Sequence, residues 1–174
     1  MRAPCAEVVR HGQTQRAGFF GSSEVALTDL GRQQLWEAAG DRRWEVIFTS
    51  PRRRCAEFAE ALADRLGIRS CTDARLAEMH FGDWEGRTAA ELMASDAEAL
   101  TRFWHNPVHH PPPGAESLGQ LRARVLSFWS ELATHGRDLP LVLTHGGPIR
   151  ILLAAQRGIP LDRLLEIEVA HAVL

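Results

Sequence analysis

The sequence predicts an α/β fold, a three-layer α/β/α sandwich built on a mostly parallel sheet. Short apolar runs alternate along the chain with longer segments whose apolar residues recur at helical spacing, a pattern typical of helix-covered parallel sheets. The run 139–144 is almost entirely apolar, as expected of a strand buried on both faces. With 174 residues, we expect 1–174 to form a single domain.

Local signals place the elements of the first half of the chain. Thr28 can cap a helix, and Ser50-Pro51 is an N-cap followed by proline in the first helical turn. Gly67 can end that second helix, whereas Glu7 is an unusual residue for a buried strand. The expected elements are a strand at 6–10, a helix at 28–39, a strand at 46–49, a helix at 50–67 and a weaker strand at 68–72.

The second half contains four helical patterns and two further strand candidates. A loop rich in proline and histidine spans 105–114, and Gly136 and Gly158 are expected to end helices. The expected elements are helices around 88–93 and 97–104, a helix at 118–132, a strand at 139–144, a helix at 148–157 and a last strand at 167–169.

Composition excludes several kinds of chemistry. All 20 basic residues are arginine and tyrosine is absent, which excludes a Walker A or Schiff-base lysine and a tyrosine nucleophile. A formal charge of −2 argues against a nucleic-acid partner, and no apolar run is long enough to span a membrane. Because Cys5, Cys55 and Cys71 form no C-x-x-C pair and no secretory leader is visible, we expect a cytoplasmic protein.

Three of the expected strands end in residues that suit phosphate binding. In an open α/β sheet, ligands bind beyond the carboxyl ends of the strands, so these segments should converge on one crevice. Each histidine there is followed by glycine, which permits close backbone approach, and a helix start supplies N–H groups for an anion. The three segments are Arg10–Thr14, Ser50–Arg54 and Thr144–Pro148.

The arginines at 52–54 lie in the first turn of an expected helix. Positive charge there opposes the helix dipole and is unfavourable unless an anion is bound. Arg52 and Arg53 are interpreted as a solvated basic surface. Arg54 lies closest to the crevice and is expected to contribute to it.

The remaining histidines are not expected to carry chemistry. His80, His135 and His171 are interpreted as structural or surface residues. Three more histidines crowd the proline-rich loop, but no carboxylate or cysteine completes a ligand set at a recognisable spacing. We therefore expect no metal site and no cofactor. The crowded histidines are His105, His109 and His110.

Taken together, four ordered motifs resemble the histidine phosphatase superfamily, which has the phosphoglycerate mutase-like fold. R-H-G alone is a weak signal, but four motifs in order across the chain are highly specific. Leu27-Thr28-x-x-Gly31 also fits the family pattern. The motifs are Arg10-His11-Gly12, Ser50-Pro51-x-x-Arg54, Glu78-Met79-His80-Phe81-Gly82-Asp83-Trp84-Glu85-Gly86 and Thr144-His145-Gly146-Gly147.

The resemblance implies a phosphomonoesterase that forms a phosphohistidine on His11. It implies that Glu78 protonates the leaving alkoxide, with Glu85 as the competing acid. Arginine forks match phosphate geometry, and neighbouring arginines favour the neutral imidazole that attack on phosphorus requires. The groups expected to hold the phosphoryl oxygens are Arg10, Arg54 and His145. The further substrate contacts expected are Gly12, Gln13, Thr14 and Gly146.

Within the superfamily, three segments resemble the alpha-ribazole phosphatases most. This resemblance implies alpha-ribazole 5′-phosphate, an intermediate of cobalamin biosynthesis, as the small-molecule phosphate ester. Ala17 departs from the family pattern, which often has an asparagine there that contacts phosphate. The segments are Phe81–Glu85, Asp96–Glu98 with Trp104, and Pro112–Ser117.

Other functions remain open at this point. Because the G-x-E-S motif is shared with broad-specificity phosphatases, the alternatives include such a phosphatase or a phosphoglycerate mutase-like phosphoryl transferase. The compact segment between Glu78 and His145 argues against the mutase branch. A third alternative is an inactive protein that binds phosphorylated ligands or a protein partner, but all five reactive side chains are present. A homodimer is compatible with the sequence.

Overall fold

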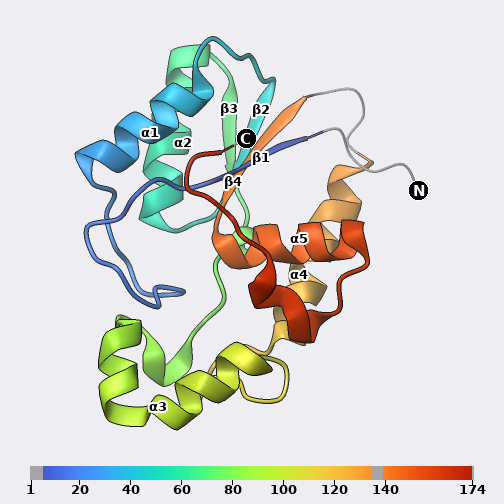
Figure 1. Ribbon diagram of the computed structural model, residues 1–174. Coiled ribbons are helices and arrows are strands. Elements are labelled where there is room, and N and C mark those ends of the chain that lie inside the picture. Colours follow the sequence, from blue (N-terminus) through green and yellow to red (C-terminus); the bar gives the residue numbers. More distant parts are fainter. Residues whose placement is uncertain (1–5, 135–138, 174) are drawn as a thin grey trace.

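The computed structural model describes residues 6–134 and 139–173 (Figure 1). Within these residues four strands form one sheet in the order β1-β4-β2-β3, and every neighbouring pair is parallel. Cys5, His135 and Gly136, named above, lie outside the described residues. The strands are β1 (Glu7–Arg10), β2 (Val46–Thr49), β3 (Arg69–Thr72) and β4 (Pro140–Thr144).

Helices cover both faces of the sheet, which confirms the expected three-layer α/β fold. In Figure 1, α1 (Asp29–Ala39) and α2 (Arg53–Leu66) lie on one side, with α4 (Leu118–Leu132) and α5 (Gly146–Arg157) on the other. Side chains along β4 alternate between the two layers. Leu141 and Leu143 pack in the cluster with α1 and α2, whereas Val142 packs with residues of α4.

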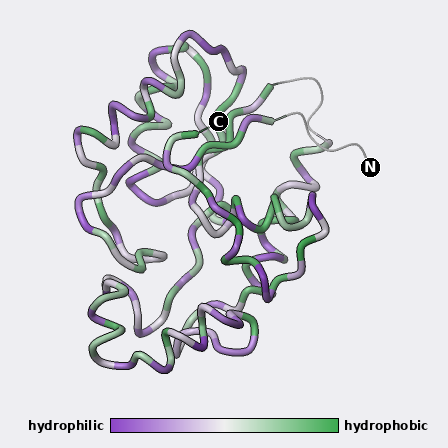
Figure 2. The backbone as a smooth tube through the Cα atoms, viewed as in Figure 1, coloured by the Kyte–Doolittle hydropathy of each residue, from purple (hydrophilic) through white to green (hydrophobic). Residues whose placement is uncertain are grey.

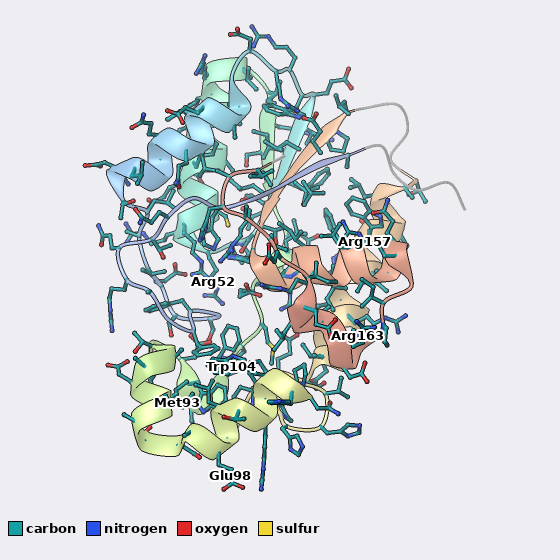
Figure 3. The ribbon with its side chains drawn as sticks, viewed as in Figure 1. Arg52, Met93, Glu98, Trp104, Arg157 and Arg163 are labelled. Carbon is teal, nitrogen blue, oxygen red and sulfur yellow. The ribbon has the colours of Figure 1, made fainter. Side chains whose placement is uncertain are left out.

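The helix α3 (Ala89–His105) lies apart from both helical layers (Figure 1). Asp96 has non-helical backbone angles in the middle of α3, which explains why the sequence showed two separate helical patterns. On α3, Glu98 points away from the rest of the molecule (Figure 3). Three short 3-10 helices complete the described elements: η1 (Ala74–Leu76), η2 (Gly82–Trp84) and η3 (Leu161–Glu166).

Most local signals act as predicted. Thr28 caps α1 by accepting a hydrogen bond from the Gly31 N–H, and Gly67 ends α2 in a left-handed conformation. All five residues of β4 are buried, as expected for a central strand of a parallel sheet. Hydrophobic and hydrophilic stretches alternate along the helices (Figure 2), as amphipathic packing requires. Among the described residues, no helix has the length and apolar character needed to cross a membrane.

Some element boundaries differ from the predictions. The second helix begins at Arg53 rather than Ser50, because the Ser50 side chain contacts His145 and accepts from the Arg52 N–H. The last helix begins at Gly146, two residues before the predicted start. Glu7 is accommodated because β1 lies at the sheet edge, where its carboxylate accepts from Arg42 and Trp44.

The predicted strand at 167–169 is wrong. This segment pairs with no strand among the described residues. Its carbonyl groups are instead used by arginine side chains: the Ile167 carbonyl accepts from Arg150 and the Val169 carbonyl from Arg10. The apolar pattern of the segment reflects packing beside α5, where Ile167 and Val169 join the core of α4 and α5.

Candidate active site

The ends of β1, β2 and β4 meet at one edge of the sheet, as the sequence predicts. The imidazole centroids of His11 and His145 are 5.1 Å apart, and Arg54 Nε lies 3.2 Å from His145 Nδ1. A cavity of about 250 Å³ opens beside them. Its lining includes Arg10, His11, Thr14, Arg54, Glu78 and His171.

His11 presents one defined nitrogen for chemistry. Its Nδ1 lies 2.8 Å from the Gly12 carbonyl oxygen, and because a carbonyl only accepts, Nδ1 carries the proton. The lone pair of the neutral ring is therefore on Nε2. Burial, assisted by the charges of Arg54 and Arg10, lowers the pKa of His11 to about 3. The ring is neutral near pH 7, as a nucleophile must be.

The loop that follows His11 is pressed against the start of α1. A Cβ atom on Gly12 would collide with the carbonyl of Gly31, so this close approach requires glycine. The Gln13 N–H donates to Gln34, and the Gln13 side chain accepts from Thr28. Gly12 and Gln13 thus fix the loop from outside the cavity lining, whereas Thr14 lines it.

Arg54 is a buried cation held by four acceptors. It is 1% exposed, and burial lowers the pKa of its guanidinium. Its Nη2 donates to the carbonyls of Phe20 and Gly21, its Nη1 to the Ser23 carbonyl, and its Nε to His145. The loop 20–23 therefore sets the orientation of this guanidinium.

His145 lies behind Arg54 and does not belong to the cavity lining. Because arginine only donates, Nδ1 of His145 accepts from Arg54, so Nε2 carries the proton and donates to Ser50 Oγ at 2.7 Å. His145 is fully buried, and burial together with the Arg54 charge keeps its pKa well below the ordinary value. In this arrangement both ring nitrogens bind protein groups, one Arg54 and the other Ser50.

Glu78 reaches the cavity from the segment between η1 and η2. Both carboxylate oxygens lie 3.1 Å from the Gly147 nitrogen at the start of α5, and a Cβ atom on Gly147 would collide with Oε1. Arg124 of α4 holds the backbone of this segment by donating to the carbonyls of Arg75, Ala77 and Glu78. The carboxylate is thus fixed among cationic groups of the site, namely Arg10, Arg54 and Arg150.

Glu85 serves a different purpose from Glu78. Its carboxylate accepts from the backbone N–H groups of Gly21, Ser22, Ser23 and Phe81. Burial disfavours its ionisation, but these hydrogen bonds outweigh burial and lower the pKa of Glu85 to about 2. A carboxylate that stays ionised near pH 7 is a poor proton donor. Glu85 clamps the loop that orients Arg54.

The arginine run at 52–54 divides only in part as the sequence suggests. Arg53 is exposed and Arg54 is buried, but Arg52 is half-buried and its Nε has no acceptor among the described residues. Arg52 and Arg53 contact Glu24, whose carboxylate accepts from the Arg52 side chain and from the Arg53 N–H. Glu24 thus supplies an anion at the start of α2, which offsets the unfavourable charge there. In the view of Figure 3, Arg52 is drawn between α2 and α3.

Arg16 and Arg150 were not identified from the sequence as residues near the site, and His171 was interpreted as a structural or surface residue. Arg150 projects from α5, near enough to Gly146 that a Cβ there would meet its guanidinium at 2.9 Å. Its position four residues after Gly146, within the first turns of the helix, is the sequence feature that could have indicated that Arg150 lies near the site. Arg16 lines the cavity outside any motif. His171 also lines it, although it was interpreted as structural or surface.

Metal ligands do not gather in the part of the chain that the structure describes. No group of three or more His, Cys, Asp or Glu side chains there could hold a metal ion. His105 is engaged through Nδ1 with the Thr101 carbonyl of its own helix.

A neutral histidine, the buried Arg54, the half-buried Arg10 and a carboxylate lie together at the carboxyl edge of a parallel sheet, an arrangement that suits phosphoryl transfer. The chain belongs to the histidine phosphatase superfamily, branch 1, whose family model matches residues 7–174. This confirms the resemblance seen in the four motifs. The protein is therefore a phosphatase or mutase of this superfamily.

The chain is similar to relatives of more than one substrate class. It is 38% identical to a glucosyl-3-phosphoglycerate phosphatase of Mycolicibacterium vanbaalenii, over 93% of this chain and 78% of the relative. Its fold matches the alpha-ribazole phosphatase of Shigella flexneri with a TM-score of 0.83 at 25% identity, over 96% of this chain and 86% of that one. The structure of a mycobacterial glucosyl-3-phosphoglycerate phosphatase in complex with inorganic phosphate matches with a TM-score of 0.81 at 32% identity, over 94% of this chain and 84% of that one.

Proposed function

We propose that the protein is a phosphomonoesterase that hydrolyses a small phosphate ester through a phosphohistidine at Nε2 of His11. The observation that carries the proposal is the state of this ring. A neutral imidazole, protonated at Nδ1, has its lone pair on Nε2 beside the guanidinium groups of Arg54 and Arg10. Such a nitrogen is a nucleophile positioned for phosphorus.

The reaction follows in two steps. In the first, Nε2 of His11 attacks phosphorus, the ester P–O bond breaks, and the carboxyl group of Glu78 transfers a proton to the leaving oxygen. In the second, water attacks phosphorus, its proton passes to Glu78, and the P–N bond breaks to release phosphate. The carboxyl group regains its proton, so the cycle is closed.

The arginines hold the phosphoryl oxygens and supply the positive charge. Nε of Arg10 is buried and has no acceptor among the described residues, so it can donate to a phosphoryl oxygen. Arg54 is fixed beside it, and His145 acts by orienting Arg54. Guanidinium groups that are already in place stabilise the charge on the transferred group without reorganisation. Thr14 and the backbone at Gly146 are further proposed contacts.

For the substrate we propose alpha-ribazole 5′-phosphate. Support comes from the motif segments within 81–117 and from the similar fold of an alpha-ribazole phosphatase. A second candidate is a glucosyl-3-phosphoglycerate-like ester, which the 38% identity to a phosphatase of that name favours. Specificity constants for both compounds, with sugar phosphates and phosphoglycerate as references, separate the two. Alpha-ribazole phosphate should be preferred at least tenfold, about 1.4 kcal/mol.

Rapid quench with ³²P-labelled substrate tests the proposed intermediate. A label that is acid-labile and base-stable should accumulate in the wild-type protein and be absent from His11→Ala. Exhaustive chelation of divalent metal should leave turnover unchanged, because arginines supply the charge. Label on serine or cysteine would refute the assignment to histidine, and activity that required added magnesium or zinc would refute the metal-free mechanism.

A further inference from the structure

The segment after η3, here called the tail (residues 167–173), is tied to the end of β1 on both sides of His171. The Val169 carbonyl accepts from Arg10 Nη1 at 2.7 Å, and the Ala172 N–H donates to the Arg10 carbonyl at 3.0 Å. Ala172 has a φ of 49°, in the left-handed region that alanine seldom adopts. These bonds hold the tail in a turn that places His171 in the cavity lining.

The imidazole of His171 is held next to His11 with a defined tautomer. Its Nδ1 lies 2.8 Å from the His11 carbonyl oxygen, so Nδ1 carries the proton and donates. The two ring centroids are 5.4 Å apart. Burial and the charge of Arg10 lower the pKa of His171, which keeps the ring neutral near pH 7. The lone pair is then on Nε2, for which the described residues provide no donor.

Hydrogen-bond acceptors are scarce around the cavity. Arginine side chains only donate, and the Thr14 hydroxyl, which donates to the Arg16 carbonyl, keeps its lone pairs as acceptors. In the proposed function Glu78 is occupied with the ester oxygen, and the lone pair of His11 attacks phosphorus. Among the described side chains that line the cavity, His171 and the Thr14 hydroxyl are then the acceptors that remain for the alcohol part of a substrate, and of the two only His171 offers a ring nitrogen with no donor of its own.

We propose that His171 is a specificity-determining residue whose Nε2 accepts a hydrogen bond from a hydroxyl group of the substrate's alcohol part. The inference rests on the proposed function. A hydrogen-bond acceptor at this position means that the site prefers phosphate esters of polyols or sugars to esters of simple alcohols. The tether through Nδ1 keeps Nε2 in place, so the ring loses little freedom when the hydroxyl binds.

Two variants and two substrates test this inference. His171→Asn retains an N–H that can donate to the His11 carbonyl but lacks Nε2, while His105→Asn is a matched control on α3. Glycerol 1-phosphate and propyl phosphate have the same carbon chain and differ in hydroxyl groups. The wild-type protein should prefer glycerol 1-phosphate, and His171→Asn should lose roughly three- to tenfold in kcat/KM on it, mainly through KM.

The loss on propyl phosphate should stay within about twofold, and His105→Asn should behave like the wild-type protein. Equal losses on both substrates, an unchanged preference in His171→Asn, or no preference in the wild-type protein would overturn the inference. Trapping of ³²P on His11 with either substrate tests the proposed function separately. Absence of the label in the wild-type protein would refute that function whatever the substrate preference.

Discussion

The ends of β1 and β4 carry the same local pattern, a histidine followed by glycine, yet the two histidines have different surroundings. His11 uses one nitrogen for a backbone carbonyl and keeps the Nε2 lone pair beside the cavity. His145 uses both nitrogens, one for Arg54 and one for Ser50. Position at a strand end brings a side chain to the site, but its hydrogen-bond partners decide whether it can react.

Among the substitutions, the largest loss of activity is expected when His11 is replaced. His11→Ala removes the proposed nucleophile and should lower kcat by roughly 10⁴-fold or more, as loss of a nucleophile does in other enzymes. Single-turnover rates on an alkyl phosphate measure this loss. A reduction of only tenfold would mean that His11 and His145 differ less than their surroundings indicate.

Glu78 comes next, with Glu85 as its matched control. Glu78→Gln should slow an alkyl phosphate by roughly 10²–10⁴-fold, and p-nitrophenyl phosphate much less, because nitrophenolate leaves without a proton. Glu85→Gln loosens the loop that orients Arg54, so any loss should be the same for both substrates. Single-turnover phosphorylation rates of both variants on both substrates measure whether the loss of rate depends on the leaving group. An equal loss on both substrates in Glu78→Gln would assign the acid elsewhere.

Substitution of His145 should reduce the rate of phosphorylation by an intermediate factor, which depends on the residue that replaces it. His145→Leu deprives Arg54 of an acceptor and should slow phosphorylation by roughly 10–100-fold, since small misplacements of a positioned group are costly. His145→Asn offers an oxygen near the position of Nδ1 and should retain more activity. If both variants lost the same large factor, His145 would instead contact the phosphoryl group itself.

The last expected effect is on the dependence of stability on pH. The pKa of His11 falls to about 3 in the folded protein from 6.5 in the unfolded chain. The unfolded chain therefore binds more protons between these values, and the free energy of unfolding falls as pH is lowered through this window. The slope approaches 1.4 kcal/mol per pH unit at most. Urea titrations of the wild-type protein and His11→Ala should show a shallower fall in the variant, and parallel curves would contradict the shifted pKa.

Much of the molecule can be predicted from the sequence because its signals are local. Apolar runs, the Thr28 cap and Gly67 define the elements, and residues at the ends of parallel strands necessarily meet at one edge. Helix starts were less predictable. The Ser50 side chain could serve as a cap or as a partner for His145, and only the folded structure shows which.

What could not be predicted depends on contacts between distant segments. His171 lies 160 positions from His11, and no local pattern shows that the tail turns back to Arg10. The alternation at 167–169 suits a strand, but its carbonyls are taken by Arg10 and Arg150. The roles of Glu78 and Glu85 likewise depend on which backbone N–H groups each carboxylate meets.

The position of the phosphoryl group on the His11 ring tests the central claim most directly. Because Nδ1 donates to the Gly12 carbonyl, the lone pair that attacks phosphorus is on Nε2. Two-dimensional ³¹P–¹⁵N NMR of phosphoenzyme trapped from ¹⁵N-histidine-labelled protein should show one P–N bond, at Nε2 of His11. A bond at Nδ1, or phosphorus on His145 or on another residue, would contradict the account.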